Sequence, residues 1–400
     1  MNVTGVVIVG AARTAIGRYG GAFRNVHPAE LGGVAARSAI SRAGIDPGAI
    51  DEVIIGHARQ AGSGPNPGRQ VARRAGLADE IPAQTLNKAC ASGLQSIASA
   101  AQAILTGESA VVLAGGIESM SRMPYLIDSE DARWGHRMGN FTLVDAMYRD
   151  GFTCSLCGMI MGETAELLAR EYGISREASD VYAVETQRRT AAAIAGGRLH
   201  DEIAPITIVD AKGQPTVVDR DEHPRADTSL ESLCKLPPVF PNVEGQIGII
   251  TAGTSSGITD GGAAVVVTSG SRASALGLTP LARITGWASA GVDPRQMGIG
   301  PVPAMRKLFA RTGLTMADFD LVELNEAFAP QVLAVLRDEP IPSEKLNVNG
   351  GAIALGHPIG CTGTRIVVTL VHEMRRRGAH RGLATLCVSG GMGMAMAIEL

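Results

Sequence analysis

Apolar positions repeat along the chain with two different periods, which predicts alternating helices and strands. After residue 92, apolar side chains recur three and four positions apart as far as 105, and Gly107 follows; this spacing is typical of a helix with one buried face that ends at glycine. A continuous apolar run over 110–116 then predicts a buried strand. Similar reasoning predicts helices at about 162–171 and at 176–195, the second capped by Ser175.

The same order of elements occurs again near the other end of the chain. Residues 42–56 and 311–325 each contain a helix end at glycine, a short turn and a buried strand, at a constant offset of 269 residues. A second helix over about 362–377 and a strand over 383–388 continue the parallel. The repeat predicts two similar α/β halves that pack as two sheets, with helices between and outside them.

A long segment between the two copies has no counterpart in the second copy. It covers roughly 121–250 and contains most of the aromatic side chains, whereas the apolar run at 261–268 fits the last strand of the first half. We therefore expect a first half at 1–120 plus 251–272, an inserted domain at 121–250 and a second half at 273–400.

Composition and charge exclude several classes of partner. Among 400 residues there are 36 basic and 39 acidic side chains, so a net charge of −3 favours neither nucleic acid nor an anionic membrane. The apolar run at 6–9 is too short to span a membrane and lacks the features of a signal peptide. Six cysteines without a secretory signal indicate reduced thiols and a cytoplasmic location.

Cysteine and histidine spacing does not predict a metal site. Cys154 and Cys157 form an isolated C-x-x-C pair, with no second pair and no nearby histidine. A thioredoxin-type redox site would require a βαβ context, which this segment lacks.

Cys90 is the first candidate for chemistry, because it stands at the predicted start of a helix. The helix dipole and the unpaired backbone N–H groups at that position lower a thiol pKa and make the thiolate available. The alternative is that Cys90 packs as a small buried hydrophobic residue.

The equivalent loops of the second half supply further candidates, since loops of related halves are expected to meet near a common axis. Asn325 follows a predicted strand, and His357 lies in a glycine-rich loop at 349–360. Cys387 ends another strand, just before a turn at 389–391 whose N–H groups suit an oxyanion hole. The alternatives are a structural histidine at 357 and a buried strand cysteine at 387.

Six motifs, in order along the chain, resemble those of the thiolase family: NKACASGLQ, AGGIESMS, TAGTSSGITDGGAAV, NEAFA, NVNGGAIALGHPIGCTG and CVSGGMG. The resemblance implies a five-layered αβαβα fold of two similar halves with an inserted loop domain. It also implies coenzyme A thioesters as substrates, with no metal or bound cofactor in the chemistry.

The resemblance also implies a role for each candidate. Cys90 matches the nucleophile that takes the acyl group, and His357 matches the histidine that activates it. Cys387 matches the acid/base that acts on the α-carbon of the second thioester. Asn325 matches the asparagine that holds a water, which forms an oxyanion hole with His357. The backbone N–H groups of Cys90 and Ser389 would form the other hole.

Binding residues are expected on the same basis. Ser256 would contact the pantetheine arm, and Ser232 would lie along the coenzyme A groove. The thioester pocket would be lined by five apolar residues, for which ordinary core packing is the alternative: Met161, Phe240, Met297, Ala327 and Phe328.

Three positions depart from the family pattern. Ser389 stands where a glycine is common, which preserves the N–H donor provided that the position does not need a positive φ. Ile160 replaces a histidine found in many acetyl-CoA-specific members, and the segment 240–251 is longer than usual.

The expected activity is that of an acetyl-CoA C-acetyltransferase: reversible Claisen condensation of two acetyl-CoA to acetoacetyl-CoA and coenzyme A. The alternative is a degradative 3-ketoacyl-CoA thiolase of broader chain length in fatty acid β-oxidation. A ketosynthase would carry histidine in place of Cys387, and a non-catalytic lipid-binding relative would lack one of the three reacting residues. The resemblance further implies a homotetramer, a dimer of dimers, with its assembly loop at 121–140.

Overall fold

The computed structural model describes residues 5–209 and 212–400. Its main sheet has 11 strands, and nine of them follow the order β13-β14-β15-β12-β1-β11-β5-β3-β4. The first half contributes β1 (Val6–Thr14), β3 (Glu52–His57), β4 (Ala83–Leu86), β5 (Val111–Ser119) and β11 (Thr259–Ser269). The second half contributes β12 (Ala282–Gly291), β13 (Leu321–Leu324), β14 (Arg381–Val388) and β15 (Met392–Glu399).

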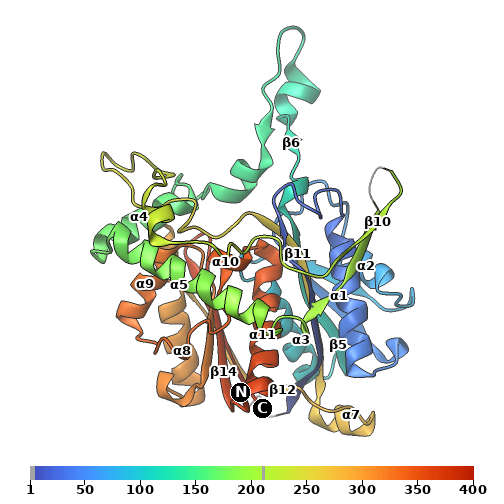
Figure 1. Ribbon diagram of the computed structural model, residues 1–400. Helices are drawn as coiled ribbons and strands as arrows, with labels where there is room; N and C mark the ends of the chain where they lie inside the picture. The colour runs from blue at the N-terminus through green and yellow to red at the C-terminus, as the bar shows by residue number, and fades with distance from the viewer. Residues whose placement is uncertain (1–4, 210–211) are drawn as a thin grey trace.

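Helices cover both faces of each half-sheet, which gives five layers (Figure 1). The central layer consists of α3 (Ser92–Thr106) and α11 (Ile359–Arg377). The outer helices are α1 (Pro28–Ala43) and α2 (Pro67–Arg74) on the first half-sheet, and α8 (Pro301–Thr312) and α9 (Ala329–Asp338) on the second. The layered arrangement implied by the family resemblance is therefore confirmed.

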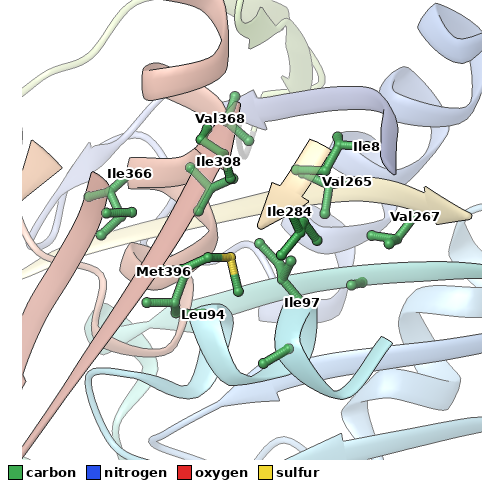
Figure 2. Close-up of a cluster of buried hydrophobic side chains, with 14 of the residues drawn as sticks. Ile8, Leu94, Ile97, Val265, Val267, Ile284, Ile366, Val368, Met396 and Ile398 are labelled. Carbon is green, nitrogen blue, oxygen red and sulfur yellow. The ribbon is translucent and has the colours of Figure 1, made fainter. Parts of the chain in front are cut away.

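The interior between the two half-sheets is filled by aliphatic side chains from both halves. Figure 2 shows Leu94 and Ile97 of α3 close to Met396 of β15 and Ile284 of β12. Burying such side chains contributes about 1.5–3 kcal/mol each. The central helices are thus fixed by packing on both sides. Their N-terminal ends directly follow the candidate residues Cys90 and His357.

The two half-sheets are not separate, contrary to the prediction of two sheets. Strands β1 and β12 pair antiparallel at Val7–Arg283 and Ile8–Ala282, so that hydrogen bonds join the halves into one sheet. The repeat in the sequence specifies each half but contains no signal for a pairing between them.

The inserted segment adds short strands and two longer helices. It contains β6 (Tyr125–Leu126), β7 (Val144–Asp145), α4 (Met161–Glu171), α5 (Arg176–Ala195), β8 (Ile203–Ala204), β9 (Ile206–Val209), β10 (Pro215–Val218) and α6 (Leu230–Cys234). Helix α5 has the predicted bounds, and Ser175 caps it by accepting a hydrogen bond from the N–H of Ala178. From β6 an arm extends well away from the body of the molecule (Figure 1).

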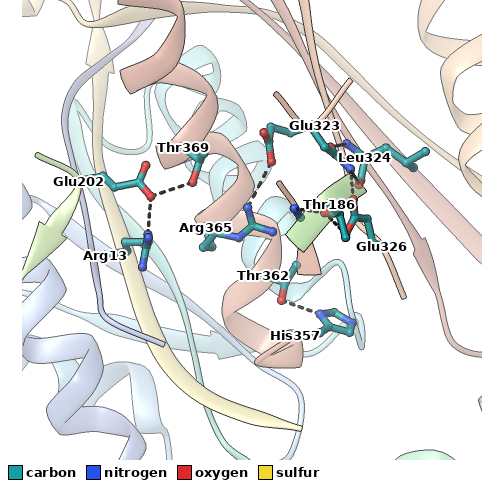
Figure 3. Close-up of polar contacts among 12 residues, drawn as sticks. Arg13, Thr186, Glu202, Glu323, Leu324, Glu326, His357, Thr362, Arg365 and Thr369 are labelled. Atoms are coloured by element: carbon teal, nitrogen blue, oxygen red, sulfur yellow. Dashed lines mark hydrogen bonds and ion pairs between the residues drawn. The ribbon is translucent and has the colours of Figure 1, made fainter. Parts of the chain in front are cut away.

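The insertion is also joined to the main sheet. Strand β8 pairs in parallel with β1, and the buried Arg13 of β1 forms ion pairs at 2.7 Å with Glu202 and with Asp221 (Figure 3 shows the first). The base of the insertion is therefore held by buried charge pairs as well as by backbone hydrogen bonds.

The remaining elements are short. They are β2 (Gly17–Arg18), which pairs with β11; α7 (Gly270–Ala275); α10 (Ala352–Leu355); the 3-10 turns η1 (Pro47–Ala49), η2 (Met120–Arg122), η5 (Pro294–Ile299) and η6 (Met316–Asp318); and the π-turns η3 (Glu130–Gly135) and η4 (Tyr148–Phe152). Within the described residues, no helix is both long enough and apolar enough to cross a membrane.

Candidate functional site

Cys90 lies at a sharp turn that leads into α3. The preceding Ala89 has a φ of +46°, a left-handed conformation that is rare for alanine. The Ser92 hydroxyl holds this turn closed, because it donates to the carbonyl of Ala89 at 2.7 Å and accepts from the N–H of Lys88 at 2.8 Å. The strained turn directs Cys90 toward the loops of the second half.

The sulfur of Cys90 accepts hydrogen bonds from two backbone N–H groups, its own and that of Ser389. Burial nevertheless raises the pKa of the thiol, and it outweighs these donors and the positive charge of Arg59. The expectation of a lowered pKa at Cys90 is therefore wrong in direction. Cys90 packs against a buried cluster that includes Met147 from the insertion, which no local pattern around Cys90 could reveal.

The turn after β14 supplies the second of these N–H groups. Ser389 does not have a positive φ, whereas Gly390 and Gly391 have φ values of +86° and +81°. Serine in place of glycine at 389 therefore imposes no backbone strain, and its N–H remains available. The turn is anchored by a 2.7 Å hydrogen bond from the Val292 N–H to the Gly391 carbonyl.

His357 is buried, and its ring has a defined orientation. Its Nδ1 lies 2.6 Å from the hydroxyl of Thr362 (Figure 3), which itself donates to the carbonyl of Pro358 at 3.0 Å. Because that hydroxyl has one proton to donate, Nδ1 is the donor to Thr362 and Nε2 carries the lone pair that can accept a proton. Burial, together with Arg365 and Arg59, lowers the pKa of His357 to about 3, so the imidazole is neutral at physiological pH.

Asn325 lies beside His357 at the end of β13. Its Nδ2 is 3.5 Å from Nε2 of His357, and its backbone N–H donates to the carbonyl of Thr385 at 3.0 Å. Among the described residues, its buried Oδ1 has no hydrogen-bond partner. An amide oxygen left free in this way is suited to accept a hydrogen bond from a water or a substrate.

Cys387 is the next-to-last residue of β14 and lies within the predicted apolar group. Burial and the neighbouring Cys90 raise the pKa of its thiol well above the usual range. Met297 and Ala327 pack around it, with Met161 and Phe328 at the edge of the same cluster. Phe240 lies directly over Gly162 at the start of α4, next to Met161. The structure thus brings together the five residues predicted to line the thioester pocket.

Ser256 belongs to a segment that joins two of these loops. Its backbone N–H donates to the carbonyl of Ala327 at 3.0 Å, and the next residue, Gly257, accepts the N–H of His357 at 3.0 Å. The chain from 254 to 257 therefore fixes the loop after β13 relative to the histidine loop.

Ser232 is exposed and lies outside the apolar group. It lines a cavity of about 260 Å³ together with His223, Arg225, Leu233 and Gly253. Its hydroxyl donates to the carbonyl of Ser229 at 2.8 Å in the first turn of α6. A half-exposed cavity with an arginine and a histidine is suited to the polar part of a large substrate rather than to its reacting end.

Sequence reasoning did not identify three residues that organise the site. Thr362 fixes the tautomer of His357. The buried Glu118 at the end of β5 accepts the N–H of Gly360 at 2.9 Å and that of Arg59 at 3.2 Å, and so connects the two halves. Arg59 donates to the carbonyls of Asp150 at 2.7 Å and Gly151 at 2.6 Å, which holds the insertion over Cys90. In the sequence, only the glycines near these residues indicate that backbone segments approach one another closely here.

Two further observations limit what the site holds. Among the described residues, no group of three or more histidine, cysteine or acidic side chains could bind a metal ion. A separate cavity of about 580 Å³, between α5 and α9, is lined by Tyr182 and Glu326 and contains none of the predicted reacting groups.

The site therefore combines two electrostatically interacting thiols, a neutral imidazole whose Nε2 can accept a proton, and paired backbone N–H groups at one sulfur. This set can form a covalent acyl-thioester, move protons and stabilise a negative oxygen. Those are the requirements for acyl transfer followed by chemistry at a carbon atom.

Known proteins similar to this chain are found by sequence and by structure. The family model for the N-terminal domain of thiolase matches residues 6–271, and that for the C-terminal domain matches 278–400. The acetyl-CoA acetyltransferase of Cupriavidus necator is 49% identical over 397 residues, which covers 99% of this chain and 100% of that protein.

Two solved structures are similar over nearly the whole chain. The Bacillus anthracis acetyl-CoA acetyltransferase has a TM-score of 0.94 at 44% identity and covers 99% of this chain and 98% of its own. Human mitochondrial 3-ketoacyl-CoA thiolase in complex with CoA has a TM-score of 0.93 at 43% identity, again covering 99% and 98%.

Proposed function

The chain belongs to the thiolase family, and we propose that it catalyses the reversible condensation of two acetyl-CoA to acetoacetyl-CoA and coenzyme A. The observation that carries this proposal is the electrostatic interaction between two thiols of unlike surroundings. The sulfur of Cys90 accepts hydrogen bonds from two backbone N–H groups. Cys387 lies in an apolar cluster, where the charge of Cys90 acts on its thiol. One thiol is suited to carry an acyl group and the other to act on carbon. The full-length similarity to acetyl-CoA acetyltransferases supports the choice of acetyl-CoA.

In the first half-reaction, the sulfur of Cys90 attacks the thioester carbonyl while Nε2 of His357 takes its proton. The N–H groups of Cys90 and Ser389 stabilise the resulting oxyanion. The tetrahedral intermediate then expels coenzyme A, whose sulfur takes the proton of Cys387. The products are acetyl-Cys90, a Cys387 thiolate and a protonated His357. The raised pKa of the Cys387 thiol makes that thiolate a strong base.

In the second half-reaction, the Cys387 thiolate removes a proton from the methyl carbon of a second acetyl-CoA. Protonated His357 and a water held by Asn325 stabilise the enolate oxygen. The carbanion attacks acetyl-Cys90, and the Cys90 sulfur leaves and recovers its proton from His357. All three side chains return to their starting protonation states. Coenzyme A enters and leaves as part of the substrates and products.

Thiolysis of acetoacetyl-CoA by the purified protein tests this proposal. We expect activity in the wild type and its loss in Cys90→Ser, because a serine hydroxyl beside a neutral imidazole of pKa about 3 is a poor nucleophile. Cys234→Ser is the matched control, since Cys234 is exposed and its thiol donates to the carbonyl of Glu231 in its own helix. An inactive, folded wild type would refute the proposal.

A second candidate is a 3-ketoacyl-CoA thiolase of broader chain length. Ile160 at the start of α4 makes this end of the pocket apolar, next to Met161, and the human mitochondrial 3-ketoacyl-CoA thiolase is 43% identical. Comparing kcat/KM for acetoacetyl-CoA and for a longer 3-ketoacyl-CoA separates the two candidates. A preference for the longer substrate would overturn the first.

We further propose a homotetramer, assembled as a dimer of dimers through the arm. The arm carries exposed apolar side chains that the single chain leaves uncovered, including Tyr125 (65% exposed), Trp134 (81%) and Met138 (91%). Apolar side chains gathered on a protruding arm are typical of an interaction surface, and a second copy is its proposed occupant.

The six free thiols support a cytoplasmic location for the enzyme.

A further inference from the structure

The C-x-x-C pair lies in a tight turn directly before α4. The Cys154 N–H donates to the carbonyl of Met159 at 2.8 Å, and the Gly158 N–H donates to the carbonyl of Cys154 at 2.7 Å. The first and last residues of a four-residue turn, which are three positions apart like Cys154 and Cys157, have Cα atoms within about 7 Å, and a disulfide needs about 4.4–6.8 Å. Cys154 is buried, whereas Cys157 is half-buried and open to a small reagent. The turn thus holds two thiols close enough to be joined.

The two sulfur atoms already interact. The thiol of Cys157 hydrogen-bonds to the sulfur of Cys154. Burial raises the pKa of Cys154, but that thiol and the backbone N–H groups of Leu156, Cys157 and Gly390 outweigh it, so the net pKa lies below its ordinary value. Burial and the Cys154 sulfur raise the pKa of Cys157. This is the pairing of one thiolate-prone and one proton-holding thiol that thiol–disulfide exchange requires.

The same turn contacts the oxyanion-hole turn of the proposed active site. The Gly390 N–H is a donor to the Cys154 sulfur, and a Cβ built on Gly390 would lie 3.8 Å from Cδ1 of Leu156. On its other side, the Ser389 N–H donates to the sulfur of Cys90. Two consecutive N–H groups of one turn therefore bind two different cysteine sulfurs.

We propose that Cys154 and Cys157 form a redox-active dithiol whose oxidation to a disulfide releases the Gly390 N–H and slows the proposed reaction. The accessible Cys157 thiol passes its proton to the Cys154 sulfur and attacks a small-molecule disulfide, which expels one thiolate. The Cys154 sulfur then attacks Cys157 in the mixed disulfide and expels the second thiolate, and the two cysteine protons go to these leaving groups. Two electrons and two protons pass to the small molecule. A disulfide sulfur is a weaker acceptor than the thiol or thiolate that it replaces, so the turn that carries the Ser389 donor loses its support. Cys154 is thus a positioning residue.

Equilibration in mixtures of reduced and oxidised dithiothreitol tests the dithiol independently of activity. A lone thiol forms no stable mixed disulfide with this reagent, because its second thiol closes the ring again. After alkylation and trypsin digestion, Cys154 and Cys157 share the peptide 150–170, whereas Cys90 lies in 89–122 and Cys387 in 382–400. We expect peptide 150–170 to lose two hydrogens in the wild type and in Cys234→Ser, but not in Cys157→Ser. Its staying fully alkylated in oxidised dithiothreitol would overturn the proposal.

The effect on rate rests on the proposed function and is measured by thiolysis on the same samples. We expect kcat to fall severalfold in proportion to the oxidised peptide 150–170, with KM unchanged, because the turn acts on the transition state. Cys157→Ser keeps a hydroxyl that can donate to Cys154, and we expect it to retain activity under reduction and to lose this response. Any oxidation-dependent fall in kcat that persists in Cys157→Ser is assigned to a disulfide between Cys90 and Cys387. A wild type with full kcat despite oxidation would refute the coupling, whereas an inactive reduced enzyme would refute the proposed function instead.

Discussion

Ser389 contributes its backbone rather than its side chain to the site. Its φ is not positive, and its N–H is directed to the sulfur of Cys90. We expect Ser389→Gly to keep wild-type kcat, because the donor remains. Ser389→Pro removes the N–H and is expected to lower kcat by about 10²–10³, as for the loss of one oxyanion-hole donor. Steady-state thiolysis, with circular dichroism to verify folding, checks both variants; equal loss in both would show that the hydroxyl matters.

His357 links the site to pH through its depressed pKa. In the folded protein the pKa is about 3, against an ordinary value of 6.5, so the unfolded chain binds more protons between these pH values. Stability contributed by the neutral ring is therefore complete above pH 6.5 and is lost as pH falls toward 3. The slope is at most about 1.4 kcal/mol per pH unit.

Comparing the wild type with His357→Asn separates the effect of protonating His357 on stability from the effects of the other histidines. We expect the Tm of the wild type to fall more steeply than that of the variant between pH 7 and pH 5. Parallel pH profiles would mean that His357 is protonated as readily in the folded as in the unfolded chain.

At the scale of elements, the contact between α3 and α11 is set by glycines. A Cβ on Gly93 would lie 2.7 Å from the backbone nitrogen of Thr364 and 2.9 Å from the carbonyl oxygen of Gly360. Neither is the movable end of a side chain, so the helices must separate to admit it. Because Cys90 precedes α3 and His357 precedes α11, their separation would displace the nucleophile from the histidine.

Gly93→Ala is therefore expected to cost about 1–3 kcal/mol of stability and to lower kcat. Thermal unfolding and thiolysis measure the two effects. Gly270→Ala in α7 is the control, since its Cβ would make only an ordinary contact of 3.6 Å. A Gly93→Ala protein with unchanged Tm and activity would contradict the close approach of the helices.

The elements could be predicted more fully than the electrostatics of the site. Regular apolar spacing and the glycine at 107 define α3, and Ser175 defines the start of α5, because these signals are local. The raised pKa of Cys90 could not be predicted, since its cause is burial, and the cluster against which Cys90 packs includes Met147 from a different segment. The hydrogen bonds of Thr362 and Glu118 likewise depend on how the two halves meet.

At the scale of the whole molecule, the arm is the feature whose apolar side chains a single chain leaves exposed to solvent. Trp134→Ser combined with Met138→Ser removes two of its most exposed apolar side chains. If the arm joins two dimers, we expect the molar mass from light scattering to fall from that of a tetramer to that of a dimer. Ile247→Ser changes a side chain that is 79% exposed and lies outside the arm, and it should leave the mass unchanged. A double variant that stays tetrameric would exclude the arm as the contact.

The division of labour between Cys90 and Cys387 is the central claim, and mass spectrometry of the acetylated enzyme tests it most directly. Incubation with acetyl-CoA, acid quenching and trypsin digestion should place one acetyl group on peptide 89–122 in the wild type and in Cys387→Ala, and none there in Cys90→Ser. Cys387→Ala should accumulate this acetyl-enzyme yet form no acetoacetyl-CoA. An acetyl group on peptide 382–400, or acetoacetyl-CoA produced by Cys387→Ala, would contradict the account.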